Sequence, residues 1–278
     1  MPVIAVVNRK GGSGKSTLAI HLAGYLANRG LAVMLGDADR QQSTLPWLRR
    51  RAAQTLPCRA VRGRALDPKD VLRPPTGVTH VVIDTPGALQ GFDLARILVF
   101  ADAVLVPVCN SAFDRESAAA CLAELRGHPR VTSGRCKVAT LGMRIDSRTS
   151  GQKHLQTWAE EQGVPFVGSL REAQTYVRCV ERGLTIFDLP AARVQTDLEQ
   201  WQPILEWLGP LIEAPATPTA EPRRSIAPAH APIAPMAPRS TAMPTPSEPD
   251  RVLTQTGSGL RKLLGWLWAA RVGPRAKP

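Results

Sequence analysis

Long apolar runs and paired cysteines are missing from this 278-residue sequence, and each absence excludes a class of protein. No run of about 18 apolar residues occurs, so we expect no transmembrane helix. The first apolar run begins at residue 3, so we expect no signal peptide. The cysteines are odd in number and show no Cys-x-x-Cys spacing: Cys58, Cys109, Cys121, Cys136 and Cys179. We therefore expect free thiols in a reducing cytoplasm, with no disulfide framework and no iron–sulfur site.

Basic residues outnumber acidic residues by 35 to 23, which gives a formal net charge of +12. The excess is present both in residues 1–212 and in residues 213–278. Such a balance favours polyanionic partners, namely DNA or an acidic membrane surface. The alternative is that the arginines only reflect genome composition and solubility.

A glycine-rich segment joins the first predicted strand, residues 3–7, to a helical pattern. It reads Lys10, Gly11, Gly12, Ser13, Gly14, Lys15, Ser16, Thr17. The standard phosphate-binding loop, G-x-x-x-x-G-K-[ST], has glycine where this chain has Asn8. Small residues let consecutive backbone N–H groups surround an anion, and the helix N-terminus adds partial positive charge. The segment predicts a nucleoside-triphosphate site in which Lys15 binds the β- and γ-phosphates and Ser16 binds Mg²⁺.

Carboxylates follow two further apolar runs. Residues 32–35 lead to Asp37 and Asp39, and residues 81–83 lead to Asp84. Ligands of parallel α/β sheets bind beyond the carboxyl ends of the strands, so these side chains should converge on the phosphates. Asp84 has the form of a Walker-B aspartate that holds Mg²⁺ through water. Asp39 is placed to orient the attacking water or the metal shell.

In their order and spacing, the motifs K-G-G-x-G-K-S-T, D-x-D-x-Q-x-S and V-I-D-T-P-G resemble those of the ParA/MinD family of deviant Walker A ATPases. Residues 102–108 and 182–188 are similar to the family's next core strand and its closing G-x-x-I-F-D segment. The resemblance covers approximately residues 1–210. It implies ATP and Mg²⁺ as cofactors, and an ATP-dependent homodimer in which Lys10 of each subunit reaches the other's nucleotide.

The same resemblance implies roles for individual residues. Residues 10–17 would form the nucleotide loop, with Thr17 at the α-phosphate. Asp39 would act in hydrolysis, and Ser16 and Asp84 would serve the metal, with Asp84 in its outer shell.

Two positions depart from the family's pattern. Arg40 stands where the family usually has proline, which fixes φ and removes a donor, so the switch segment is looser or Arg40 reaches a phosphate or a partner. Many members carry an asparagine near the end of a late strand that reads adenine. Here the stretch is Leu141-Gly142-Met143-Arg144-Ile145-Asp146, and it assigns no residue to the base.

Strands and helices alternate through residue 212, which predicts an α/β fold: a doubly wound, mostly parallel sheet with helices on both faces, as in P-loop NTPases. We expect strands at 3–7, 32–36, 80–84, 103–108, 136–142 and 165–168, and helices at 15–29, 42–53, 91–100, 114–126, 149–162, 172–182 and 191–208. The stretch 54–78 predicts loop with at most one short strand.

Residues 1–212 thus form the predicted ATPase domain. Residues 213–250 are rich in proline and alanine and predict a disordered, flexible linker. Residues 251–278 predict a basic amphipathic helix in which Leu260, Leu264 and Trp268 fall on one face. The helix would dock on a partner, lie on a membrane surface or pack on its own domain, and the sequence leaves these alternatives open.

Two groups of arginines are candidates for DNA contact. The first consists of Arg49, Arg50, Arg51, Arg59, Arg62 and Arg64. The second consists of Arg171, Arg178 and Arg182, on or next to the helix predicted at 172–182, with spacings that place them on one helical face. Because the family's DNA surface includes basic residues in this later region, we favour the second group.

The sequence therefore predicts a cytoplasmic, nucleoid-associated ATPase that resembles ParA. Its ATP-bound dimer would bind DNA non-specifically and would segregate or position a plasmid, a chromosome or a large protein assembly. A partner that is ParB-like, or a cargo adaptor, would stimulate hydrolysis. One alternative is a MinD-like positioning ATPase with peripheral membrane contact through the C-terminal helix. Another is a metabolic enzyme of the same superfamily that phosphorylates or amidates a small substrate.

Deleting residues 213–278 should leave basal ATPase activity and DNA binding intact and abolish localisation to the cargo or membrane. The reason is that a helix on so flexible a linker acts as a tethered docking element. ATPase assays, DNA binding and fluorescence localisation compare the two chains. An insoluble truncated protein, or a large fall in its melting temperature, would mean instead that Leu260, Leu264 and Trp268 complete the core.

Overall fold

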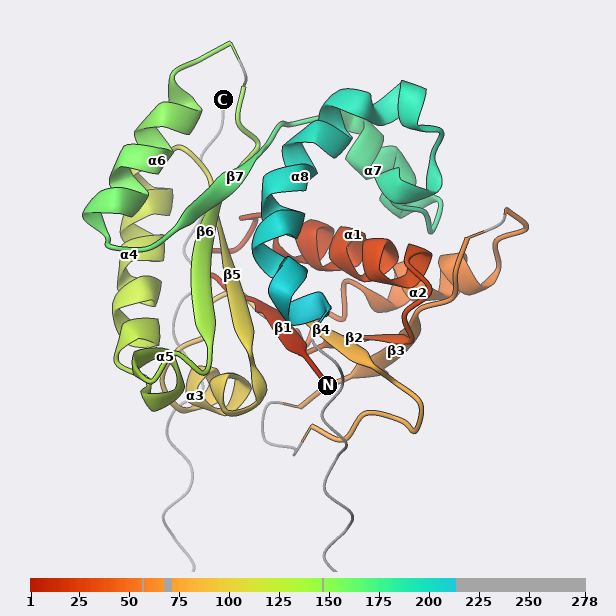
Figure 1. Cartoon of the computed structure of the whole chain (residues 1–278), viewed down its shortest axis with the longest axis horizontal. Helices are drawn as coiled ribbons and strands as arrows, with labels where there is room; N and C mark the ends of the chain where they lie inside the picture. Colours follow the sequence, from red (N-terminus) through yellow and green to blue (C-terminus); the bar gives the residue numbers. More distant parts are fainter. Residues whose placement is uncertain (57, 68–71, 147, 214–278) are drawn as a thin grey trace, which may run out of the picture. The chain divides into compact units, whose positions relative to one another are not determined.

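The computed structural model describes residues 1–56, 58–67, 72–146 and 148–213 (Figure 1). In this part of the chain, seven parallel strands form one sheet in the order β3-β2-β4-β1-β5-β6-β7. The strands are β1 (Val3–Val6), β2 (Val33–Asp37), β3 (Arg62–Ala65), β4 (His80–Asp84), β5 (Ala103–Val108), β6 (Lys137–Met143) and β7 (Phe166–Leu170). The predicted α/β fold with a parallel sheet is confirmed, and β3 is the short strand allowed for within 54–78.

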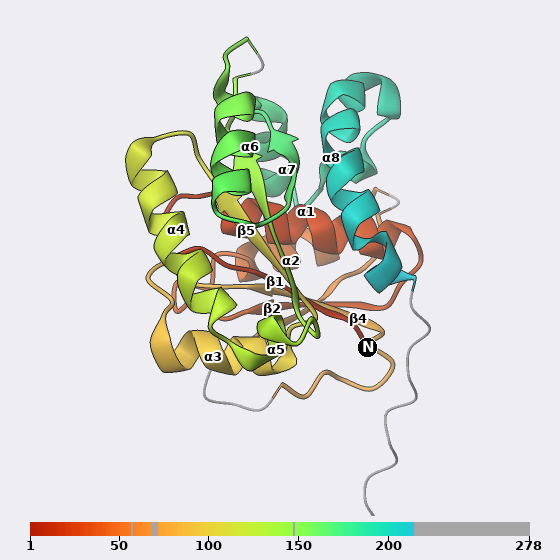
Figure 2. The same cartoon turned by 60° about the vertical axis from the view of Figure 1, so that its left-hand side comes forward.

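Helices cover both faces of the sheet (Figure 1, Figure 2). They are α1 (Lys15–Asn28), α2 (Leu45–Ala52), α3 (Gly91–Phe100), α4 (Ala112–Arg126), α5 (Pro129–Thr132), α6 (Gly151–Glu161), α7 (Gln174–Glu181), the 3₁₀ turn η1 (Ile186–Asp188) and α8 (Ala191–Ile212). One apolar cluster joins the sheet to α1, α2, α7 and α8, and a second joins it to α3, α4 and α6.

The central strands β1, β2, β4 and β5 are buried throughout because their side chains point alternately to the two faces of the sheet and helices cover both faces. In β1, Ile4 and Val6 belong to the first cluster, whereas Val3 and Ala5 belong to the second. A strand covered on both sides reads as a continuous apolar run, which is why these strands could be predicted from the sequence.

The strand order places β4 and β2 on one side of β1, and β5 and β6 on the other. In the parallel register, Asp84 of β4 lies beside both Val6 of β1 and Asp37 of β2. The carboxyl ends of these strands therefore meet at one edge, next to the loop that follows β1. Open α/β sheets bind their ligands at such a point, where successive strands are added on opposite sides of the first strand.

The last described helix runs further than its sequence suggests. α8 continues through Pro203 and Pro210 to Ile212, beyond the predicted end at residue 208. Proline removes a helical hydrogen bond, but the buried face of α8, with Trp201 and Leu208 fully enclosed, keeps the helix in place.

The predicted linker and C-terminal helix, residues 213–250 and 251–278, lie outside the described residues except for Glu213 and remain predictions. Among the helices that the structure describes, none has the length and apolar character needed to cross a membrane.

Candidate functional site

Residues 8–17 connect β1 to α1 in a loop that is held by its own polar groups. The buried Asn8 side chain donates from Nδ2 to the Pro107 carbonyl of β5 (2.7 Å) and accepts at Oδ1 from the Lys10 N–H (3.0 Å). The Lys10 carbonyl then accepts a hydrogen bond from Lys15 Nζ (2.9 Å). Asn8 therefore supports the loop from the position where the standard motif has glycine.

Two glycines are required by the conformation of the loop. Gly12 and Gly14 have φ angles of 76° and 90°, in the left-handed region that favours glycine. At Gly14 space is also short, because an added Cβ would lie 2.6 Å from Met143 Cε at the end of β6. The end of β6 thus packs directly against the loop.

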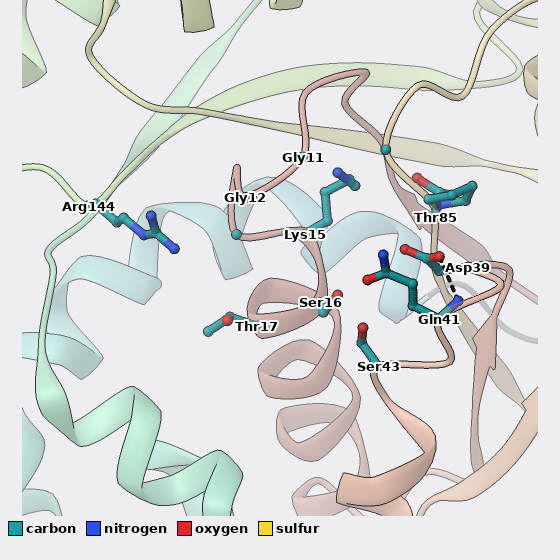
Figure 3. A pocket seen from close by; sticks show the side chains of 13 residues that line it. Gly11, Gly12, Lys15, Ser16, Thr17, Asp39, Gln41, Ser43, Thr85 and Arg144 are labelled. Carbon is teal, nitrogen blue, oxygen red and sulfur yellow. Dashed lines mark hydrogen bonds between the residues drawn. The ribbon is translucent and has the colours of Figure 1, made fainter. Parts of the chain in front are cut away.

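A cavity of about 430 Å³ opens above this loop at the carboxyl edge of the sheet (Figure 3). Segments 39–43 after β2 and 85–87 after β4 line one part of it, and Arg144 after β6 lines another. Of the residues predicted for nucleotide, metal or catalysis, those that line the cavity are Gly11, Gly12, Gly14, Lys15, Ser16, Thr17 and Asp39. Lining residues that were not predicted include Gln41, Ser43, Thr85 and Arg144.

Lys15 lines the cavity, and Asp84 lies buried beneath it, close enough to interact electrostatically with Lys15. Burial lowers the pKa of the Lys15 ammonium, and the negative charges of Asp84 and Asp39 oppose that effect. Asp84 is fully enclosed, and neither of its carboxylate oxygens has a hydrogen-bond partner among the described residues. Burial raises the pKa of Asp84 to about 7, although the nearby Ser16 hydroxyl acts in the opposite direction. A buried carboxylate without a partner is costly, and a cation beside it would remove that cost.

The two aspartates after β2 have different surroundings. Asp37 is buried, and its Oδ2 accepts hydrogen bonds from the Thr44 N–H (2.8 Å) and hydroxyl (2.7 Å). Its Oδ1 accepts from the Asp39 N–H (3.0 Å), so Asp37 fixes the segment that carries Asp39. Asp39 faces the cavity, with its Oδ1 bonded to the Gln41 N–H (2.9 Å; Figure 3). Of the two, Asp39 is the carboxylate that lines the cavity.

Lys10 does not line the cavity beside its own loop. Its Nζ forms an ion pair with Asp114 Oδ1 of α4 (2.8 Å), and Asp114 also accepts a hydrogen bond from the Ser111 hydroxyl. These contacts with Lys10 and Ser111 hold the pKa of Asp114 below its usual value against the effect of burial. Ser13 is buried and donates to the Lys10 carbonyl (3.2 Å), so it also shapes the loop without lining the cavity. No sequence pattern indicated Asp114, because the contact spans about a hundred residues of chain.

The structure separates the three late arginines that were predicted to share a helical face. Arg171 precedes α7, and its guanidinium is bonded to both carboxylate oxygens of the buried Asp197 (2.7 and 3.0 Å). The prediction of a common face is therefore wrong for Arg171, because it precedes α7 and is paired with the buried Asp197 of α8. Arg178 lies on α7 and Arg182 directly follows it, and both are exposed.

The C-terminal ends of α2 and α7 lie against each other. An added Cβ on Gly183 would come within 2.9 Å of Arg50 Cβ, and the Arg51 guanidinium donates to the Gly183 carbonyl (3.3 Å). Arg51 is buried in an ion pair with Asp188 (2.9 Å), whereas Arg49 and Arg50 are exposed. Arg50 of α2 thus lies close to Gly183, next to Arg182, and the two predicted groups come from elements that pack together. We call Arg49, Arg50, Arg178 and Arg182 the α2–α7 basic face.

Comparisons with known proteins agree with this geometry. Residues 4–186 match the family model described as the CobQ/CobB/MinD/ParA nucleotide binding domain. The maintenance of carboxysome distribution protein A of Gloeobacter kilaueensis is 34% identical over 188 residues, which is 66% of this chain and 83% of the relative.

Solved structures show the same fold at lower identity. An ATP complex of a McdA variant from Cyanothece has a TM-score of 0.54 at 15% identity and covers 75% of this chain and 96% of that one. The septum site-determining protein MinD of Pyrococcus horikoshii, solved with Mg-ADP, has a TM-score of 0.53 at 15% identity and covers 76% and 97%.

Replacing the unpaired carboxylate, Asp84→Asn, should stabilise the protein in the absence of ligands. Because the folded-state pKa of Asp84, about 7, lies above its ordinary value of 3.8, the folded state retains a proton that the unfolded state loses. Its contribution to stability therefore falls as the pH rises from 4 to 7. The gain in the variant should be about 2–4 kcal/mol at pH 8 and should vanish near pH 4.

Thermal unfolding of the two proteins at several pH values measures this difference. Asp93→Asn, at an exposed aspartate of α3, is the control and should not raise the melting temperature. A lower melting temperature for Asp84→Asn than for the wild type at pH 8 would contradict the account of the buried carboxylate.

Proposed function

This chain belongs to the CobQ/CobB/MinD/ParA nucleotide-binding family, with positioning ATPases among its relatives, and we propose that it is a ParA-like ATPase that dimerises on ATP and binds DNA non-specifically. The resemblance to ParA/MinD ATPases found in the sequence is thereby confirmed. The main observation in support of the proposal is that two lysines of one loop have different positions. Lys15 lines the cavity, whereas Lys10 is paired with Asp114 and does not line it.

The site suits a nucleoside triphosphate with Mg²⁺. The N–H groups of the loop, Lys15 and the N-terminus of α1 supply positive charge for the phosphates. Ser16 would hold the ion, with the unpartnered, buried Asp84 as the anion nearest to it. Bound Mg²⁺ would neutralise charge on the β- and γ-phosphates, and Asp39 would orient the attacking water.

Dimerisation would bring Lys10 to the nucleotide of a second subunit. A monomer with Lys15 already in the cavity has no need of a second loop lysine for the same phosphates. The Lys10 side chain is 37% exposed, and its ion pair with Asp114 must open before the ammonium can reach a partner. Contact of Lys10 with the partner would therefore depend on ATP being bound in the other subunit.

Replacing this lysine, Lys10→Ala, should leave ATP binding near normal and keep the protein monomeric. The reason is that the variant retains every group of its own cavity and loses only the charge offered to the partner. Isothermal titration measures ATP binding, and size-exclusion chromatography with light scattering measures the dimer in the presence of Mg²⁺ and a non-hydrolysed ATP analogue.

Two controls accompany this experiment. Lys15→Ala should fail to bind ATP, because the phosphates lose their main counter-charge, and Lys137→Ala, at an exposed lysine of β6, should dimerise like the wild type. A dimer of normal affinity formed by Lys10→Ala would contradict the role in trans.

DNA is the polyanion that we propose for the α2–α7 basic face. Its four arginines are exposed and come from two elements that are packed together. Contacts of arginine with phosphates add affinity without sequence preference, as a protein that moves over bulk chromosomal DNA needs. Arg171 is left out of this face because its guanidinium is already paired with Asp197.

Replacing Arg49, Arg50, Arg178 and Arg182 by alanine should weaken binding to any duplex and flatten its salt dependence by about one unit of slope for each phosphate that is no longer bound. ATP-dependent dimerisation should not change. Arg171→Ala should lower the melting temperature instead, because Asp197 would stay buried without its partner.

Fluorescence anisotropy at several salt concentrations gives the slope. Arg135→Ala, at an exposed arginine between α5 and β6, should behave like the wild type. An unchanged slope in the fourfold variant would mean that these arginines are only a solvated surface.

The cargo and the stimulating partner follow from the relatives only as proposals. The carboxysome distribution protein suggests a large protein assembly as cargo, and the chromosome-partitioning ATPase Soj of Thermus thermophilus suggests a chromosome. We propose that the protein works in the cytoplasm over the nucleoid, with a ParB-like protein or a cargo adaptor stimulating hydrolysis. A MinD-like membrane role would depend on residues 251–278.

A further inference from the structure

Arg144, at the end of β6, has an unusual backbone conformation that its buried neighbours hold in place. Its φ angle is 56°, in the left-handed region that a non-glycine residue rarely adopts. The residues on both sides are buried: Met143 packs against Gly14 of the phosphate loop, and the Ile145 N–H donates to the Leu170 carbonyl (3.1 Å). Strained backbone of this kind persists where the surroundings fix it, and it is concentrated at functional sites.

The Arg144 side chain is exposed and lines the nucleotide cavity, where its charge helps to lower the pKa of Asp114. Among the described residues no hydrogen bond or ion pair reaches its guanidinium. The carboxylate closest to it in sequence, Asp146, is bonded on both oxygens to Arg148 (3.0 and 2.8 Å). A planar cation thus lies at the cavity with its hydrogen-bond donors available for a ligand.

The strand order indicates which end of a nucleotide would meet this cation. The phosphate loop follows β1, and the segments that carry Asp39 and Thr85 follow β2 and β4, all on one side of β1. Arg144 follows β6, on the other side. Figure 3 shows the same separation, with Arg144 across the loop from Asp39 and on the side of Thr17. A triphosphate that directs its γ-phosphate toward Asp39 must therefore direct its nucleoside toward Arg144.

We propose that Arg144 holds the nucleoside of the bound triphosphate by placing its guanidinium against the base. This inference rests on the proposed binding of ATP and adds the contact that the sequence left unassigned. The phosphates already have the loop N–H groups, Lys15 and the helix N-terminus, whereas the described lining of the cavity contains no aromatic side chain for the base. A guanidinium stacks on an aromatic ring and is weakly hydrated, so it can replace such a side chain.

The test compares two ligands, MgATP and magnesium tripolyphosphate, in titrations of the full-length chain. Arg144→Ala should weaken MgATP binding about tenfold and leave tripolyphosphate binding unchanged, because tripolyphosphate lacks the base. Arg144→Lys should restore little of the loss, since an ammonium has charge but no planar face. Arg148→Ala is the matched control, because Arg148 belongs to the same loop but is paired with Asp146; it should bind both ligands like the wild type.

Each other outcome overturns a defined part of the account. Equal weakening of both ligands, or full rescue by lysine, would make Arg144 a phosphate contact and reject the proposed base contact. Unchanged MgATP binding in Arg144→Ala would reject any role in nucleotide binding. If the wild type itself failed to bind MgATP, the proposed function would fail, and that result is distinct from a failure of Arg144 alone.

Discussion

The hydrogen bond from the Lys15 ammonium to the Lys10 carbonyl (2.9 Å) is the contact on which the arrangement of the site depends. It closes the phosphate loop across five residues, and it leaves the Lys10 side chain paired with Asp114 of α4. Asn8 completes the closure by linking the Lys10 N–H to β5. In the proposed dimer, one loop would thereby offer a lysine to its own nucleotide and a second lysine to the partner.

One charged group near this loop, the carboxylate of Asp84, is buried without a hydrogen-bond partner in the described part of the chain. Asp84 lies at the end of β4 because the parallel register places it between Asp37 and Val6, far from solvent. Asp37 is satisfied by Thr44 and Asp39, but Asp84 is not satisfied within the described residues. Bound positive charge at the site would offset the cost of this group and would join the stability of the protein to the occupancy of its site.

The parts of the fold and the site that could be predicted from the sequence are those determined by residues close together in the chain. The phosphate loop and the strand-end carboxylates are encoded in short segments, and parallel strands bring their ends together in any fold of this class. Two ion pairs, Lys10 with Asp114 and Arg171 with Asp197, join residues far apart in the chain. The spacing of residues in the sequence therefore predicted neither contact. Helical periodicity placed Arg171 on a face that it does not share, because α7 begins three residues later. In the sequence, Arg144 was only part of a stretch that departs from the family pattern. Its place at the cavity became visible only in the structure, because segments far apart in the chain form that cavity.

Complementation between two inactive variants would show whether Lys10 completes the site of the other subunit. Lys10→Ala retains an intact cavity, and Lys15→Ala retains an intact Lys10; neither should hydrolyse ATP alone. When the two are mixed, a heterodimer carries one complete site, in which the cavity of the first variant meets the lysine of the second. Partner-stimulated ATP hydrolysis should therefore reappear in the mixture at a fraction of the wild-type rate. A mixture as inactive as its separate components, although the heterodimer forms, would contradict it.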